Sequence, residues 1–244
     1  MKSSIKNVFL ALLGAFFLAA AASAQAADPL PKADEVVAKM MEFDAQRRSE
    51  LTGYTAIRRY IAANGKHHAE MLVDVSCASD GSENFNILSE QGSGWIRSHI
   101  FRKLLTEETE ASRRRSGEST RITPANYNFQ IIGEETLNTG SAYVLTVAPK
   151  TANKYLFDGK IWVDANDYSI VRIEAQPARN PSFWVRSVHI VRTYQKLGPF
   201  WFASSTDTTS HILIFGRADL NIENSNYNLN PPKDTTFEGS EIIR

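Results

Sequence analysis

The spacing of apolar side chains changes along the chain, and each change predicts a different element. Apolar residues first recur every three or four positions over 33–45, with charged residues between them, which predicts a helix with one packed face. Asp34 near its start and Arg47 and Arg48 near its end suit the two ends of a helix. From Gly53 the alternation has a period of two, which predicts β-strands.

The first strands form a predicted meander of three. They cover 54–61, 69–77 and 84–89, with turns at Asn64-Gly65 and at 79–82. Helical spacing then returns in a second helix, which Ser93-Gly94 opens and whose large apolar residues are Trp95, Ile96, Ile100, Phe101, Leu104 and Leu105.

The rest of the chain reads almost entirely as strands separated by turn signals. Eight are predicted, at 127–135, 142–148, 160–164, 169–175, 183–194, 201–205, 210–215 and 218–223. Successive strands without an intervening helix imply an antiparallel sheet, and the twist of so large a sheet curls it. The predicted fold class is therefore α+β and mostly β: a curled antiparallel sheet of about eleven strands, an open or half β-barrel, covered by two helices.

The alternation also predicts an apolar concave face that could bind an apolar ligand. Candidate ligand-binding residues are those expected on this face and on the second helix, which would act as a lid: Met71, Val73, Val75, Ile100, Leu104, Leu145, Val147, Val171 and Ile173. Plain core packing, with no space beneath the second helix, is the alternative.

The N-terminus has the pattern of a secretory signal peptide. Lys2 and Lys6 precede an apolar run over 8–22, and Ala24-Gln25-Ala26 follows as a cleavage site. We therefore expect residues 1–26 to be a signal peptide and residues 27–244 to be one soluble, exported domain. An uncleaved membrane anchor is the alternative.

Cysteine content and charge narrow the possible functions. Cys77 is the one cysteine of the chain, so no internal disulfide forms, and its place in an alternating apolar stretch predicts a buried, inert thiol. Without Lys2 and Lys6 the chain carries 25 basic and 27 acidic side chains, a net charge near −2. That balance argues against nucleic acid as a partner.

The sequence offers no catalytic or metal-binding motif. It lacks H-E-x-x-H, C-x-x-C and G-x-S-x-G. Adjacent His67 and His68 point to opposite faces of a strand, whereas His189 and His211 lie in strands and could face each other. We therefore predict no catalytic residue, no metal and no cofactor, and a hydrolase is the third hypothesis.

Three segments resemble those of a known family. They are Gly159-Lys160-Ile161-Trp162-Val163-Asp164, Tyr168-Ser169-Ile170-Val171-Arg172-Ile173-Glu174 and Gly198-Pro199-Phe200-Trp201-Phe202-Ala203-Ser204. With the order of elements, they resemble the bacterial outer-membrane lipoprotein-sorting (LolA/LolB-like) superfamily. The resemblance covers nearly all of the mature chain, but these motifs are structural. Unlike the receptor member of the family, this chain has no cysteine at the cleavage site.

The resemblance implies a function as well as a fold. Family carriers hold acyl chains in a lidded cavity without catalysis, and an arginine in an early strand holds the lid; Arg58 and Arg59 both lie near that place. We therefore expect a periplasmic, non-enzymatic binding protein whose ligand is a lipid or lipoprotein acyl chain, with a possible periplasmic or membrane protein partner. The alternative is a periplasmic protein–protein interaction or sensor module of the same fold without lipid transport.

Overall fold

The computed structural model describes residues 29–114, 120–153, 155–180, 185–213 and 216–229. The first helix, α1, spans Ala33–Glu50, as its apolar spacing predicts. Strands β1 (Gly53–Asn64), β2 (His67–Ala78) and β3 (Glu83–Gly92) follow as a meander. A continuous helical segment comes next, made of α2 (Gly94–Ile96), the π-helical turn η1 (Arg97–Phe101) and α3 (Arg102–Arg114). The remaining strands are β4 (Tyr127–Leu137), β5 (Gly140–Pro149), β6 (Phe157–Asp164), β7 (Ile170–Pro177), β8 (Val185–Leu197), β9 (Phe200–Ile212) and β10 (Gly216–Leu229).

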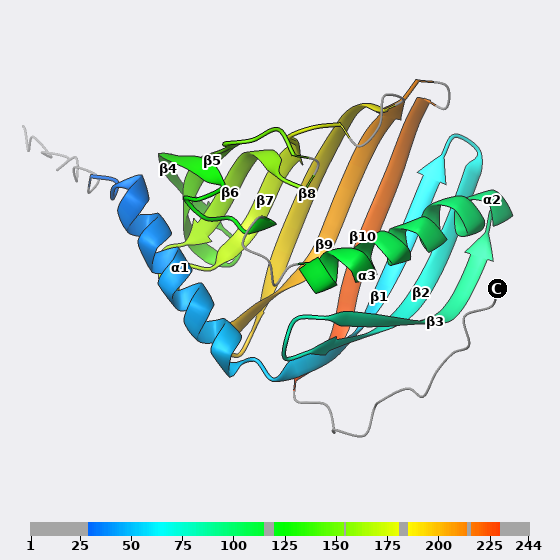
Figure 1. Ribbon diagram of the computed structural model, residues 1–244, viewed down its shortest axis with the longest axis horizontal. Helices are drawn as coiled ribbons and strands as arrows, with labels where there is room; N and C mark the ends of the chain where they lie inside the picture. The colour runs from blue at the N-terminus through cyan, green and yellow to red at the C-terminus, as the bar shows by residue number, and fades with distance from the viewer. Residues whose placement is uncertain (1–28, 115–119, 154, 181–184, 214–215, 230–244) are drawn as a thin grey trace, which may run out of the picture.

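Within the described residues the ten strands form one antiparallel sheet. Its order is β3-β2-β1-β10-β9-β8-β7-β6-β5-β4, so β3 and β4 are the edges and the sheet does not close on itself (Figure 1). This confirms the curled, open antiparallel sheet. The strand predicted at 201–205 and residues 210–212 of the next predicted strand lie in one strand, β9, because the polar residues 206–209 contain no glycine or proline and continue the ladder to β8 and β10. Residues 214–215 of that prediction lie outside the described residues.

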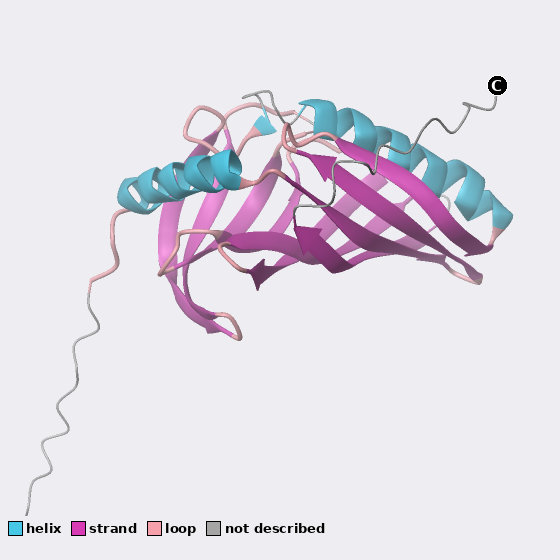
Figure 2. Cartoon of the chain, turned by 90° about the horizontal axis from the view of Figure 1, so that it is seen from below, coloured by secondary structure: helices cyan, strands magenta, loops and turns pink. Residues whose placement is uncertain are grey.

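Both helical segments lie on the same face of the sheet (Figure 2). Figure 1 shows α1 beside the β4–β7 end and α3 across the β1–β3 end. Each helical segment carries apolar side chains that it buries against another element. The sheet supplies two separate apolar surfaces for this, one at each end.

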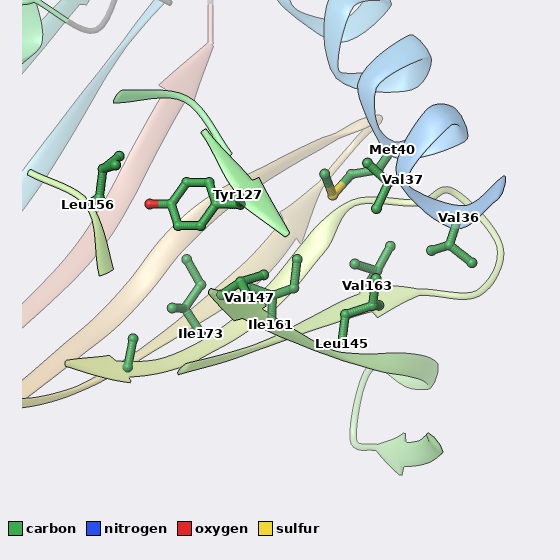
Figure 3. Packing of buried hydrophobic residues seen from close by; sticks show 11 residues of the cluster. Val36, Val37, Met40, Tyr127, Leu145, Val147, Leu156, Ile161, Val163 and Ile173 are labelled. Carbon is green, nitrogen blue, oxygen red and sulfur yellow. The ribbon is translucent and has the colours of Figure 1, made fainter. Parts of the chain in front are cut away.

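The first core cluster joins α1 to the β4–β7 end of the sheet. Figure 3 shows Val37 and Met40 of α1 facing residues of the sheet that include Leu145 and Val163. Its sheet residues alternate along their strands, as period-two patterning requires. They are Tyr127, Leu145, Val147, Ile161, Val163, Ile173 and Ala175, none more than 9% exposed.

The second core cluster lies beneath η1 and α3. Met71, Val73 and Val75 of β2 are wholly buried there, together with Tyr60 of β1. Ile96 and Phe101, five residues apart, are both buried because the π-helical turn places them on the same side.

A polar strip separates the two core clusters in the middle of the concave face. Thr206 of β9 pairs with Ile222 on one side and with Arg192 on the other. Arg192 Nε donates to Thr206 Oγ1 at 2.9 Å. The apolar concave face expected from the sequence is therefore divided in two, and each helix covers one part.

Candidate functional site

The structure contains a cavity of about 310 Å³ between the C-terminal half of α1 and the sheet. Its walls come from four regions of the sequence: α1 with the residue that follows it, the segment before β4, the residues at and before the start of β7, and the stretch from the end of β8 to the start of β9. Most lining residues are apolar or aromatic: Met40, Met41, Leu51, Ile122, Tyr168, Ile170, Tyr194, Phe200, Trp201 and Phe202. The polar ones are Asp44, Arg47, Arg48, Arg121, Thr123 and Ser169. A largely apolar wall with a few grouped charges is typical of a ligand pocket.

Helix α1 places both kinds of side chain on one face. Met40, Asp44 and Arg47 lie four and three residues apart, so they follow one another along the side that faces the sheet. The buried stripe begins with Val36 and Val37, and its chemistry turns from apolar to charged over the last two turns. Arginines near a helix C-terminus also interact favourably with its dipole.

Aromatic residues at the start of β9 form the opposite wall. Phe202 packs against the rings of Tyr227 and Tyr54, with centroids 4.7 and 5.0 Å away. Trp201 Nε1 donates to Asp167 Oδ2 at 2.8 Å, and Lys196 Nζ lies 2.8 Å from the same oxygen. Burial would raise the pKa of Asp167, but these two donors, together with Ser169, outweigh it and hold the pKa below its usual value.

The arginines at the cavity share few acidic partners. Arg47 Nη1 donates to the backbone carbonyl of Asp167 at 2.9 Å. Arg48 pairs with Asp44 one helical turn earlier. Arg121 Nη2 lies 3.6 Å from the same Asp44 carboxylate, so a single carboxylate serves two guanidinium groups.

A second polar arrangement connects α3 to β1. Arg58 Nη1 lies 2.7 Å from Glu108 Oε2 of α3, and Tyr60 donates to the same oxygen at 2.7 Å. Arg58 also contacts Glu83 at 3.4 Å and donates to Asn224 at 2.8 Å. Burial lowers the pKa of Arg58, but the two carboxylates outweigh it, so the pKa is raised and the guanidinium stays charged.

The neighbouring arginine has a different environment. Arg59 follows Arg58 in β1, so its side chain points to the other face of the sheet. There it pairs with Glu70 at 2.7 Å and lies 3.4 Å from Glu223. Of the two candidates from the sequence, Arg58 is the one that contacts the helix.

The nine residues predicted to bind a ligand are divided among different surroundings. Met71, Val73 and Val75 are buried in the second core cluster, against which Leu104 packs. Leu145, Val147 and Ile173 belong to the first. None of these seven lines the cavity, although Ile170, Tyr168 and Tyr194, which do, pack against the first core cluster.

Two of the nine lie away from the predicted interior. Ile100 is 36% exposed because the π-helical turn brings Phe101 inward in its place. Val171 is the extra residue of a β-bulge opposite Trp162 and Val163. It packs instead with Ala142, Val144 and Trp162 on the opposite face of the sheet.

Other sequence predictions have mixed outcomes. Cys77 is half-buried rather than fully buried. The register places His211 opposite Ser187 and His189 opposite Thr209, so the two histidines are not paired. The proposed signal peptide, residues 1–26, lies outside the described residues. Among the described helices, none is long and apolar enough to cross a membrane.

The cavity residues that sequence reasoning missed had a recognisable signal. Met40 and Met41 continue the apolar stripe of a helix that then ends in Arg47 and Arg48, and 200–202 is an aromatic run. Neither pattern shows that the two segments meet, because 150 or more residues separate them. Their proximity follows from the pairing of distant strands.

No protein-family model and no curated protein matches this chain. Solved structures that resemble it include a DUF1329 family protein from Desulfovibrio piger, 11% identical with a TM-score of 0.44, covering 83% of this chain and 95% of that one. A putative outer membrane lipoprotein-sorting protein domain from Vibrio parahaemolyticus is 13% identical, with a TM-score of 0.42, over 82% of this chain and 95% of that one. A LolA superfamily protein from Nitrosomonas europaea is 10% identical, with a TM-score of 0.38, over 86% and 99%. Similarity at this level assigns no ligand to this chain.

Proposed function

We propose that this protein is exported to the periplasm and binds an apolar ligand there, an acyl chain or the lipid part of a lipoprotein, without catalysing a reaction. The observation that supports this is the cavity beneath α1. Its volume of about 310 Å³ lies at the low end of the roughly 300–1,000 Å³ typical of small-molecule sites. Its walls are mainly apolar and aromatic, which suits shielding of a hydrocarbon chain from water.

The expected affinity is modest. Each methylene removed from water contributes about 0.8 kcal/mol, so eight methylenes contribute roughly 6 kcal/mol before the cost of association is deducted. A single myristoyl chain binds a membrane reversibly for the same reason. A chain held in this cavity would therefore exchange readily with another acceptor, as carrier function requires.

The two ends of the sheet have different roles in this proposal. At the β1–β3 end, Arg58 fastens α3 over a core that contains the wholly buried Met71, Val73 and Val75. At the β4–β7 end, the cavity leaves space under the last turns of α1. Ligand exchange would therefore involve movement of α1 rather than of the second helix.

Quenching of Trp201 by a brominated fatty acid tests the proposal. Bromine quenches a tryptophan that lies near it, and Trp201 lines the cavity while its side chain also packs against Trp162 and its neighbours on the opposite face. We expect saturable quenching in the wild-type protein and in Trp95→Phe, because Trp95 lies on α2, in the other helical segment. Most of the saturable quenching should disappear in Trp201→Phe. Absence of saturable quenching in every form would contradict the proposal, and native mass spectrometry of protein from its own periplasm would show any lipid that co-purifies.

A second candidate function is a periplasmic protein-interaction or sensor module. The exposed Trp95 and Ile100 on α2 and η1 favour it, because exposed large apolar side chains often contact partners. Trp95→Glu should then abolish co-purification of a periplasmic partner without changing the thermal midpoint of unfolding. Retention of the partner by this variant would contradict that role.

A further inference from the structure

We propose that the ligand of this cavity is an anionic amphiphile with one alkyl chain, whose head group is bound by Arg47, Arg48 and Arg121. This inference rests on the proposed binding function and specifies the class of ligand. The alkyl chain would lie against the apolar wall, for example Met40 and Phe202. Methionine adapts easily to irregular apolar shapes.

The charged residues at the cavity carry an excess of positive charge. Arg47, Arg48 and Arg121 line it, with Asp44 as the one carboxylate among its lining residues. Asp44 pairs with Arg48 and lies 3.6 Å from Arg121, so it neutralises at most one of them. The lining residues therefore have a formal charge of about +2, which attracts an anion.

Asp167 does not neutralise this excess. Arg47 reaches the backbone carbonyl of Asp167, which is an uncharged acceptor. The Asp167 carboxylate instead accepts from Trp201 and from Lys196, which balances its charge. These donors hold the pKa of Asp167 below its usual value, so the pair adds no net charge near neutral pH.

The helix dipole accounts for only part of this arrangement. Arg47 and Arg48 lie in the last turn of α1, where basic residues are favoured in any helix. Arg121 lies before β4 and belongs to no helix, yet its guanidinium approaches the same Asp44 carboxylate. Guanidinium groups match the oxygens of phosphate and carboxylate groups with paired hydrogen bonds.

The position of the arginines suits a head group at the boundary with water. The side chains of Arg48 and Arg121 are 46% and 29% exposed, whereas Phe202 is 7% exposed. An amphiphile would thus keep its polar end near solvent and its chain inside. The cavity volume of about 310 Å³ suits one alkyl chain rather than several.

Calorimetry with two amphiphiles of equal chain length tests the inference. Decyl phosphate is anionic and decyl glucoside is neutral, and both are used below their micelle concentrations. We expect decyl phosphate to bind at least about tenfold more tightly at low salt, because hydrogen bonds between the guanidinium groups and an anionic head group are stronger than those to a neutral one. Half-exposed charges are screened, so the ratio should fall as salt rises.

Two matched double variants distinguish binding at the proposed head-group site from an effect of the overall charge of the protein. Arg47→Gln/Arg121→Gln should remove the preference for decyl phosphate and leave the affinity for decyl glucoside unchanged. Lys103→Gln/Arg217→Gln removes the same charge from side chains 75% and 65% exposed elsewhere, and should keep the preference. Circular dichroism verifies that both variants fold.

The other possible results would each overturn a different part of the proposal. Equal affinity for the two amphiphiles would overturn the anionic head group and leave the proposed function intact. Inorganic phosphate that binds as tightly as decyl phosphate would overturn the amphiphile as the ligand. Binding of neither amphiphile would overturn both this inference and the proposed function.

Discussion

Replacement of Arg58 by leucine should destabilise the protein much more than the same change at Arg59. The Arg58 side chain is 12% exposed, and its partners Glu83 and Glu108 are 5% and 20% exposed. Leucine would remove the Arg58 cation from both carboxylates and would remove the hydrogen bond to Asn224. Loss of one partner from a buried ion pair costs about 3–5 kcal/mol, so we expect a loss of that size.

Arg59→Leu is the matched control because it removes the same side chain from the next position in β1. Arg59 is 42% exposed, and its partner Glu223 is 49% exposed. Exposed ion pairs contribute about 0–1 kcal/mol, so Arg59→Leu should change the free energy of unfolding by no more than that.

Urea denaturation, followed by circular dichroism, measures both changes, and hydrogen exchange locates them. Amide protection in α3 should fall most in Arg58→Leu, since Glu108 lies on that helix. Equal losses in the two variants, or a loss below about 1 kcal/mol for Arg58→Leu, would refute the conclusion that Arg58 holds α3 to the sheet.

Three further predictions test register and charge. In urea denaturation, Phe101→Ala should lower the free energy of unfolding by about 3–5 kcal/mol and Ile100→Ala by less than about 0.5 kcal/mol, because the π-helical turn buries Phe101 and exposes Ile100. The reverse order would disprove that register. Ile173→Asp should destabilise by about 3 kcal/mol or more through an unpaired buried charge, whereas Glu174→Lys should do little, and equal thermal shifts would contradict this. Because the folded state lowers the pKa of Asp167, this carboxylate should stabilise the fold above its ordinary pKa of 3.8, and the stabilisation should be lost as pH falls through the folded pKa. The difference in free energy of unfolding between the wild-type protein and Asp167→Asn should therefore be constant from pH 7 to 5 and shrink below pH 4. A difference that grows in acid would disprove the direction of the shift.

Local periodicity was sufficient to predict the elements and most of the buried positions. Period-two alternation placed Met71, Val73 and Val75 on one face of β2, and all three are wholly buried. The same logic identified Leu145 and Val147 in β5. These predictions succeed because the side-chain direction of a regular strand or helix depends only on position along it.

The same reasoning from periodicity failed at two positions where the backbone is irregular. A β-bulge adds one residue to β7 and moves Val171 to the opposite face. A π-helical turn adds one residue to the helix and exposes Ile100. Each insertion shifts the side-chain direction at one place only, a single helical turn or a single pair of strand residues, and the pattern of apolar residues does not reveal such a local shift.

The sequence alone thus determined the two helices, the run of strands and their alternating apolar positions, because these follow from neighbours a few residues apart. Only the tertiary structure decided that Arg58 rather than Arg59 reaches a helix, since the choice depends on which face of the sheet α3 covers. It also decided the place of the cavity, where Met40, Arg121 and Phe202 meet. Their proximity depends on the order in which distant strands pair, with β10 beside β1, and no local spacing encodes that order.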